Sequence, residues 1–254
     1  MRDATLPDLS GTVTLVTGAT GGVGRGIALR FAEAGSAVVV HGYRSPADAV
    51  AGEIASRGGT ALALTADLTD DAQCTALVEA ATAWHGRLDT LVNNAGIQPV
   101  QPLPDLSPAE WRVMLDTDLT SAFVCTQAAA RVMRGRGGSI THIASIEADR
   151  PAAGHAHYGA AKAGLLAHAR AAALEYGPHG IRVNTVSPGL VDRPGLAGDW
   201  PDGVRRWLAA APLGRLGSPA DVGNACVFLA SPMASWITGH DLTVDGGVTA
   251  RPTW

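Results

Sequence analysis

The sequence predicts an α/β fold: one domain in which a doubly wound parallel sheet of seven strands carries helices on both faces. Short runs rich in β-branched residues alternate with longer helical segments along the whole chain. Two helix starts are marked as well, since Ser107-Pro-Ala-Glu110 and Ser218-Pro-Ala-Asp221 each place an acid three residues after a capping serine. The 254 residues contain no visible linker or repeat, so we expect a single domain over 1–254.

Seven apolar runs of strand length define the expected sheet. In chain order they are Val13 to Val16, Ala37 to His41, Ala61 to Ala66, Leu88 to Asn93, Ser139 to Ser145, Ile181 to Ser187 and Leu242 to Val244. A helix through about Ala34 is expected after the first run. Two longer helices, Ala109 to Met133 and His155 to Tyr176, are expected after the fourth and fifth.

Charge and apolar content exclude several classes of partner. The net charge of −4 argues against nucleic acid and anionic membranes. No apolar run approaches the ~18 residues of a membrane span, and Met1-Arg2-Asp3 does not open a signal peptide, so we expect a cytoplasmic protein. The three cysteines, Cys74, Cys125 and Cys226, lack metal-ligand spacing and are expected to be reduced core residues, with no metal bound.

The first expected strand runs directly into a glycine-rich turn and a helix. The turn reads Thr17-Gly18-Ala-Thr-Gly-Gly22-Val-Gly24. Glycines permit a tight turn and let a pyrophosphate approach the backbone N–H groups at a helix N-terminus. A glycine-rich run alone is often just a loop, but this position in the first strand–helix unit predicts a dinucleotide site.

The only lysine of the chain, Lys162, lies four residues after Tyr158, one of three tyrosines, although the other eighteen basic side chains are arginines. Residues four apart share one face of a helix. A nearby ammonium can supply the roughly 4 kcal/mol that lowers a tyrosine pKa from about 10 to about 7. We interpret Tyr158 and Lys162 as a catalytic pair; the alternative is an exposed aromatic–lysine pair on an amphipathic helix.

These motifs, together with others farther along the chain, give a resemblance that covers Gly11 to Gly247. The sequence resembles the short-chain dehydrogenase/reductase family, and its 3-oxoacyl-acyl-carrier-protein reductase-like members in particular. The resemblance implies a Rossmann-type fold and hydride transfer between a nicotinamide and a ketone or secondary alcohol. The motifs that carry it are the glycine turn, Asp67-Leu68, Asn93-Asn94-Ala95-Gly96, Ser145, Tyr158-x-x-x-Lys162, Pro188-Gly189, Thr238-Gly239 and Asp245-Gly246-Gly247.

The resemblance also implies roles for individual residues. Tyr158 would be the acid/base, Ser145 would hold the substrate oxygen, and Lys162 would bond the nicotinamide ribose and lower the pKa of Tyr158. The implied cofactor-binding residues are Gly18, Thr20, Gly22, Val23, Gly24, Asp67, Leu68, Asn94, Ala95, Gly96, Tyr158, Lys162, Pro188, Gly189 and Val191.

Some of these residues also have purely structural interpretations. Ser145 could be a helix or turn cap, and Asp67 could cap the next helix together with Thr69. The Asn93 to Gly96 segment could be only a turn, because asparagine and glycine both tolerate left-handed backbone.

Two positions depart from the family's pattern. The usual catalytic asparagine corresponds to Asp118, whose backbone carbonyl is still available for the water-placing role that the resemblance implies. The frequent threonine after Pro-Gly, which contacts the nicotinamide carboxamide, corresponds approximately to Arg193, and an arginine accepts no hydrogen bond. Arg193 could instead meet a substrate carboxylate, a cofactor phosphate or solvent.

The end of the second expected strand bears on which nicotinamide is used. The run Tyr43-Arg44-Ser45 contains no acid to accept from an adenosine 2′-hydroxyl. Arg44 with Ser45 could hold a 2′-phosphate, and Tyr43 could stack on adenine, so the sequence favours NADP over NAD. Gly21 stands against this, because many NADP-using members have a base there; a solvated turn arginine is the alternative.

The substrate side is less specific. The segment 190–212 is expected to be a mobile, partly apolar lid with Trp200, Trp207 and Leu208. We expect Gln98, Ile146, Glu147, Ala153 and His155 to line the pocket because they lie near Ser145, Tyr158 and the Asn-Asn-Ala-Gly turn in sequence.

Two hypotheses follow for the whole protein. The first is an active NADP-dependent reductase or alcohol dehydrogenase acting on a small carbonyl or alcohol. The second is a non-redox enzyme of the same fold, such as an isomerase or cyclase, or a cofactor-binding partner subunit. Intact Ser145, Tyr158 and Lys162 favour the first. The resemblance further implies a homo-oligomer, a tetramer above all, packed through the two long helices.

Overall fold

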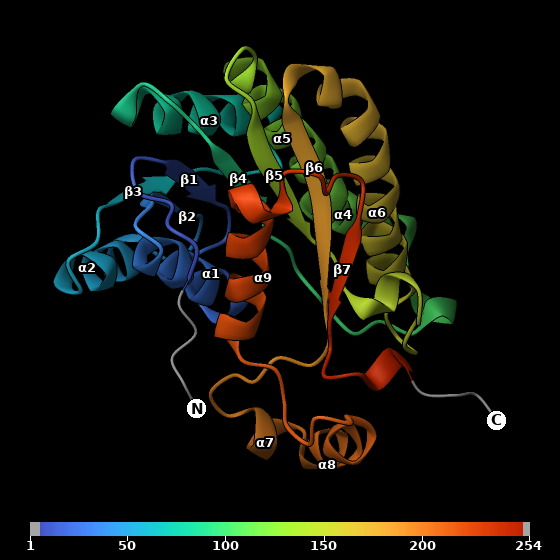
Figure 1. The fold of residues 1–254 in the computed structure, drawn as a ribbon. Helices are drawn as coiled ribbons and strands as arrows, with labels where there is room; N and C mark the ends of the chain where they lie inside the picture. The colour runs from blue at the N-terminus through green and yellow to red at the C-terminus, as the bar shows by residue number, and fades with distance from the viewer. Residues whose placement is uncertain (1–5, 251–254) are drawn as a thin grey trace.

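The computed structural model describes residues 6–250 and contains one seven-stranded sheet (Figure 1). Its strand order is β3-β2-β1-β4-β5-β6-β7, and every neighbouring pair is parallel. The predicted doubly wound sheet is therefore confirmed, while the start Met1 to Asp3 lies outside the described residues. The strands are β1 Val13–Val16, β2 Ala37–Gly42, β3 Ala61–Thr65, β4 Thr90–Asn93, β5 Gly138–Ile143, β6 Ile181–Pro188 and β7 Asp241–Val244.

Helices cover both faces of this sheet, and each face has its own apolar core (Figure 1). Side chains such as Ile27, Ile54 and Val227 bury one face beneath α1 Gly22–Glu33, α2 Asp48–Ser56 and α9 Pro219–Ala230. Side chains such as Leu77, Met133 and Ala169 bury the other beneath α3 Asp71–His85, α5 Ser121–Met133 and α6 Ala156–Tyr176. The three cysteines are buried free thiols, as predicted.

Local sequence signals fix several element ends. Both predicted capping boxes form. The Ser107 and Ser218 hydroxyls accept from the backbone N–H groups of Glu110 and Asp221, and the backbone N–H of each serine donates to the carboxylate of the same acid. The strand expected to reach Ser145 ends instead at Ile143. Ser145 then caps a 3₁₀ turn, Ile146–Ala148, by accepting from the Glu147 N–H at 3.1 Å. The turn-cap interpretation of Ser145 is thus correct for its local structure.

The helix expected over Ala109 to Met133 is confirmed, but a π-helical turn interrupts its α-helical geometry. The structure has α4 Pro108–Leu115, a π-helical turn Asp116–Thr120, and then α5. A π turn inserts an extra residue into the helical ladder and often marks a functional position. Here it carries Asp118, whose side chain is fully buried, toward the end of the sheet.

A buried polar chain links the central strands behind the site. Asn93 at the end of β4 donates to Nδ1 of His142 on β5 at 3.1 Å and to Thr126 of α5 at 3.1 Å. The His142 ring stacks on His168 of α6 with centroids 5.1 Å apart. Complete burial lowers the pKa of His142 to about 3, so this ring is neutral at physiological pH.

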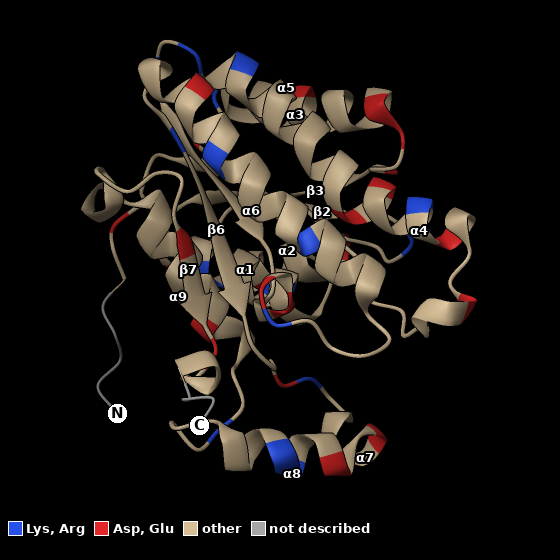
Figure 2. Cartoon of the chain, turned by 90° about the vertical axis from the view of Figure 1, so that its right-hand side faces the viewer, with Lys and Arg blue, Asp and Glu red and all other residues tan. Residues whose placement is uncertain are grey.

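The segment expected to be a lid follows β6 and forms two short helices, α7 Leu196–Asp199 and α8 Pro201–Ala210. Figure 2 shows α7 and α8 set apart from the main body, beyond the carboxyl end of β6. Within residues 6–250 no helix combines the length and the apolar character needed to cross a membrane.

Candidate active site

The carboxyl ends of β1 and β4 meet at the point where the strand order reverses, the usual ligand position in open α/β sheets. Four hydrogen bonds join the loops that follow these two strands. The Thr17 hydroxyl accepts from the N–H groups of Asn94 at 2.9 Å and Ala95 at 3.0 Å. The Asn94 amide donates back to the carbonyls of Thr17 at 2.9 Å and Gly18 at 3.0 Å. The Asn93 to Gly96 segment therefore ties the loop after β4 to the loop after β1.

The glycine turn contains two kinds of glycine. A Cβ on Gly24 would lie 2.3 Å from the Gly18 carbonyl oxygen and 2.4 Å from the Asn94 amide, so this glycine is needed by the protein itself. Gly21 and Gly22 meet nothing within 4 Å, and Gly21 is the N-cap of α1 without a side-chain cap. This open backbone at a helix N-terminus fits a dinucleotide pyrophosphate. Thr20 and Val23 flank it.

His41 is a residue of this loop that sequence reasoning missed. Its Nδ1 accepts from the Gly18 N–H at 3.1 Å, and its Nε2 lies 3.0 Å from the Ala66 carbonyl oxygen. Burial lowers the pKa of His41, and the neutral Nε2–H tautomer satisfies both contacts. No sequence signal could have found this role, because His41 stands in an apolar strand run.

The end of β2 presents Tyr43, Arg44 and Ser45 to solvent. The Arg44 guanidinium carbon lies 5.4 Å from the centre of the Tyr43 ring. Asp67, at the end of β3, accepts from the N–H and hydroxyl of Thr69, and these bonds, with a further one from Tyr43, hold its pKa below the usual range. The cap of α3 is Asp70, so the capping interpretation of Asp67 is wrong.

Tyr158 and Lys162 lie on one face of α6, as their spacing predicted. The Lys162 ammonium is 5.3 Å from the centre of the Tyr158 ring, and Lys162 is only 5% exposed. The interpretation as an exposed surface pair is therefore wrong. Ser145 lies within hydrogen-bonding reach of Tyr158, and its bond acts to lower the pKa of that phenol. The three side chains thus converge from the end of β5 and from α6.

The expected lowering of the Tyr158 pKa is not found. Burial raises the pKa of Tyr158, and the negative charges of Asp118 and Glu147 raise it further, against the opposing hydrogen bond of Ser145. The Lys162 ammonium is engaged elsewhere: it donates to the Ile143 carbonyl at 3.1 Å and forms an ion pair with the Asp118 carboxylate at 3.1 Å. Its charge is therefore largely compensated before it acts on Tyr158.

Three of the residues expected to face a substrate form one polar cluster beside Ser145. The Glu147 carboxylate lies 2.8 Å from Nδ1 of His155 and accepts from the Gln98 amide at 3.1 Å. The His155 ring packs edge-on against Tyr158, with centroids 6.0 Å apart. The cluster therefore adjoins the Tyr158 phenol, while Ile146 belongs to the intervening turn and Ala153 is exposed.

The residues of the expected lid segment do not all face one pocket: Trp207 packs inward, whereas Arg193 and Trp200 are exposed. Trp207 packs over Gly189, where a Cβ would lie 2.6 Å from its ring, so α8 covers the Pro188–Gly189 turn. Val191 bridges to Gly217. Arg193 pairs with Asp199 at 2.7 Å, and both side chains are more than half exposed. Trp200 packs on Gly203 inside the lid and is 46% exposed. A hollow of about 570 Å³ opens between residues 192–198 and Ser218–Pro219.

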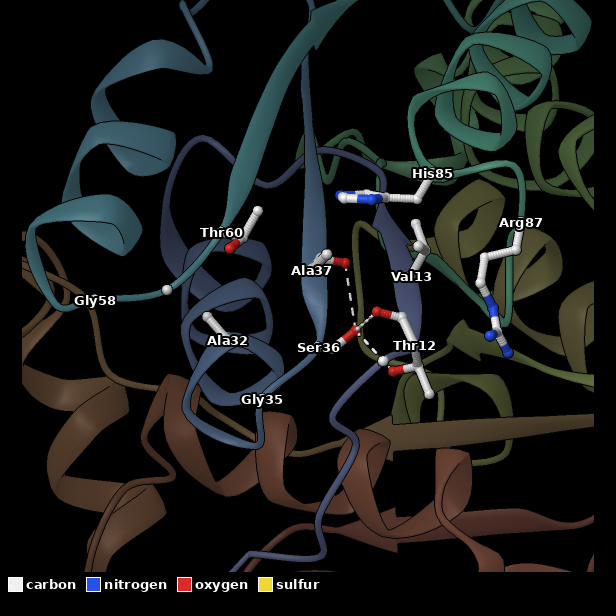
Figure 3. Close-up of a pocket in the computed structure, with 12 residues that line it drawn as sticks. Thr12, Val13, Ala32, Gly35, Ser36, Ala37, Gly58, Thr60, His85 and Arg87 are labelled. Carbon is white, nitrogen blue, oxygen red and sulfur yellow. Dashed lines mark hydrogen bonds between the residues drawn. The ribbon is translucent and has the colours of Figure 1, made fainter.

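A second hollow, of about 470 Å³, lies at the amino end of β1 and β2 (Figure 3). Ser36 there bonds to Thr12, and Arg87 is held by Asp89 at 2.6 Å. None of the predicted site residues lines it. The chemistry-bearing side chains therefore gather at the opposite, carboxyl edge of the sheet.

Comparison with known proteins agrees with this geometry. Residues 18–249 match a family model described as enoyl-(acyl carrier protein) reductase. The chain belongs to the short-chain dehydrogenase/reductase family. It is 44% identical over 241 residues, 94% of this chain and 96% of the relative, to cis-4-hydroxycyclohexanecarboxylate dehydrogenase of Sinomonas cyclohexanicum.

Two further members extend the comparison. L-rhamnose 1-dehydrogenase (NAD(P)(+)) of Azotobacter vinelandii is 42% identical, with 92% of this chain and 95% of that protein aligned. The structure of a 7α-hydroxysteroid dehydrogenase complexed with NADH and 7-oxo glycochenodeoxycholic acid superposes with a TM-score of 0.90 at 36% identity, covering 94% of this chain and 95% of that one. The chain is accordingly an oxidoreductase of a short-chain dehydrogenase/reductase family whose members bind nicotinamide cofactors.

Two glycines of the turn give a matched pair of variants. Gly24→Ala is expected to lower the free energy of unfolding by about 1 to 3 kcal/mol, because the new methyl group overlaps Gly18 and Asn94. Gly21→Ala meets open space at a φ of −171° and is expected to keep the stability of the parent. It should still weaken dinucleotide binding by about tenfold, or about 1.4 kcal/mol.

Thermal unfolding and fluorescence titration of bound NADPH or NADH measure the two effects. Equal loss of stability in both variants would contradict the different roles given to Gly21 and Gly24. Unchanged nucleotide affinity in Gly21→Ala would show that the nucleotide phosphates do not bind at this turn.

Proposed function

We propose that this protein is an NAD(P)-dependent oxidoreductase of the EC 1.1.1 class that interconverts a secondary alcohol and a ketone, with Tyr158 as the acid/base. The observation that carries the proposal is the convergence of Ser145, Tyr158 and a buried Lys162 at the carboxyl edge of the sheet. They connect to the loop after β4 through Asp118, which pairs with Lys162 and accepts from the Ile97 N–H. The intact set favours this proposal over a non-redox activity or a partner-subunit role.

The division of labour follows from the chemistry of each group. The nicotinamide, when bound, accepts a hydride from the alcohol carbon in oxidation and supplies one to the ketone carbon in reduction. Tyr158 takes the hydroxyl proton in oxidation and returns it in reduction. Ser145 has a single hydroxyl proton, which it would donate to the substrate oxygen in place of its bond to the phenol. Lys162, with one proton still free of Ile143 and Asp118, would bind the nicotinamide ribose.

The substrate we propose is a ring-borne secondary alcohol or ketone that carries a second polar group. The Gln98–Glu147–His155 cluster supplies hydrogen-bonding groups beside Tyr158, and Trp207 supplies an apolar wall above Gly189. The named substrates of the relatives support this class, since they include a hydroxycyclohexanecarboxylate and a sugar. The bile-acid derivative bound to the hydroxysteroid dehydrogenase is also a ring ketone with a distant acid.

For the cofactor we favour NADP, with NAD as the alternative. Arg44 and Ser45 are exposed at the end of β2, where a 2′-phosphate would lie, and the Tyr43 ring beside Arg44 offers a stacking surface for adenine. The Arg44 charge helps to lower the pKa of Asp67, and Asp67 would contact the adenine ring of the cofactor. Relatives use both forms: one is named for NAD(P) and another is complexed with NADH.

Replacing Tyr158 with phenylalanine removes only the proton-exchanging hydroxyl. We expect kcat for oxidation of a cyclic secondary alcohol, or for ketone reduction, to fall by about 100-fold or more, because a general acid/base contributes about that much. Nucleotide affinity should remain near that of the parent. Tyr176→Phe, the same change at the far end of α6, is the control and should retain activity.

Absorbance of the reduced nicotinamide follows turnover in both directions. Full activity in Tyr158→Phe would refute the assigned role, and turnover of no alcohol or ketone by the parent, despite tight nucleotide binding, would favour a non-redox enzyme.

Arg44→Ala tests the cofactor. Loss of a charge-assisted bond to the 2′-phosphate is expected to weaken NADPH binding by about tenfold or more while leaving NADH affinity unchanged. Arg131→Ala, which removes an arginine bonded to Gln127 on α5, is the control. Fluorescence titration at fixed salt gives the four dissociation constants. Tighter binding of NADH by the parent, with no effect of Arg44→Ala, would assign the site to NAD.

For the assembly we propose a cytoplasmic homotetramer. Two separate surfaces expose large apolar side chains: Phe123 and Leu174 on α5 and α6 at 45% and 81%, and Met233 and Trp236 after α9 at 71% and 100%. Two different self-complementary interfaces build a tetramer of D2 symmetry.

Sedimentation velocity is expected to give a tetramer for the parent. Trp236→Arg should convert it to dimers, because one interface is lost. Leu103→Arg, at an exposed leucine of the 3₁₀ turn Leu103–Asp105 and outside both sets of residues, should leave the tetramer intact. A monomeric parent would contradict the assembly.

A further inference from the structure

The carboxylate of Asp118 is placed to act on the Tyr158–Lys162 pair through its side chain. The π-helical turn brings Asp118 inward until its side chain is 0% exposed. One carboxylate oxygen accepts from the Ile97 N–H at 2.8 Å, and the other lies 3.1 Å from the Lys162 ammonium. Both oxygens are thus fixed by groups of other elements, one in the loop after β4 and one on α6.

The fit around this carboxylate is tight. A Cβ on Gly96 would lie 2.6 Å from the Asp118 oxygen that faces Lys162, so only glycine leaves room for the ion pair. Lys162 is held from the other side by the Ile143 carbonyl at 3.1 Å. Neither charged group has freedom to turn away from the other. Burial raises the pKa of Asp118, and the Lys162 charge and the Ile97 N–H oppose that rise because they stabilise the carboxylate.

The combined charge of Asp118 and Lys162 determines how readily the Tyr158 phenol ionises. A lone ammonium 5.3 Å from the ring centre would stabilise the phenolate. With Asp118 ionised the pair is neutral, and loss of the Tyr158 proton leaves one uncompensated negative charge in a buried site. The other titratable groups around the trio are Glu147 and His155 at the end of β5 and start of α6, His157 on α6, and His142 on β5. Among these only Glu147 adds a further negative charge.

We propose that the Asp118 carboxylate, acting through Lys162, sets the pH at which Tyr158 exchanges its proton, so that alcohol oxidation by this protein requires more alkaline solution than the same site with an uncharged residue 118. Asp118 is a positioning residue in this proposal, because it touches Lys162 and not the substrate. The part of the inference that concerns the pH dependence of alcohol oxidation rests on the proposed function. The raised pKa of Tyr158, toward which the Asp118 charge contributes, supports it.

The direction of the effect follows from the two forms of the phenol. Oxidation needs the phenolate, so its rate rises with pH through the pKa of Tyr158; reduction needs the phenol, so its rate falls through the same pKa. Removing the Asp118 charge lowers that pKa. Both profiles should therefore move to lower pH together, by about one unit, the scale expected for one buried charge at this range.

The test compares Asp118→Asn with Asp116→Asn. Asp116 is exposed on the same π-helical turn, so the second variant removes the same charge from the same element without touching Lys162. We expect the midpoint of the pH profile of kcat/KM to fall by about one unit in Asp118→Asn and to stay in place in Asp116→Asn. Asp118→Ser, which is smaller, should shift the midpoint in the same direction if the asparagine variant folds poorly.

A second measurement does not depend on turnover. Alkaline ultraviolet titration, taken as the difference between each protein and its Tyr158→Phe counterpart, isolates Tyr158 from the other two tyrosines. Over the pH range in which circular dichroism stays constant, Tyr158 should ionise at lower pH in Asp118→Asn than in the parent. A shift here without alcohol turnover would support the inference and refute the proposed function. Equal titration in both proteins, or a kinetic midpoint that stays or rises, would overturn the inference.

Discussion

The interlock between the β1 and β4 loops is the contact on which the site depends. Four hydrogen bonds join Thr17 and Gly18 to Asn94 and Ala95, two of them between Thr17 and Asn94, and Gly18 and Gly24 leave the space in which those bonds form. Through them the glycine turn, which we assign to the cofactor, is held at a fixed distance from the loop after β4, which continues to Gly96 and Ile97. His41 fixes the same turn from the β2 side. The nucleotide side and the chemical side of the site are thus parts of one rigid frame.

Behind this frame the sheet is polar at its centre, which is unusual for a buried parallel sheet. Asn93, Thr126, His142 and His168 form a continuous line from β4 to α6. The Asn93 amide nitrogen is satisfied within this line, whereas the Asn93 Oδ1 and the His142 Nε2 are buried without a hydrogen-bond partner, which costs free energy. The line ends on α6, the helix that carries Tyr158 and Lys162. Its geometry therefore contributes to the placement of the catalytic face.

The features that could be predicted from the sequence are those that depend on residues close together along the chain. The glycine turn, the two capping boxes and the Tyr158–Lys162 pair each depend on residues within about one or two helical turns of one another, and each was confirmed as geometry. The π-helical turn, the His41 contact and the direction of the Tyr158 pKa shift depend on groups from distant parts of the chain. Such contacts have no signature in one sequence. The cofactor form and substrate remain proposals for the same reason, since they depend on side chains grouped only by folding.

The contact between Gly96 and Asp118 also restricts how this protein can evolve. Any side chain at position 96 would occupy the space of the Asp118 carboxylate, so the two positions are not free to vary independently. A larger residue at 96 displaces the Asp118 side chain unless residue 118 is shortened, and either change alters the partner of the only lysine in the chain. Sequence drift at position 96 is therefore coupled to the charge pair of the site.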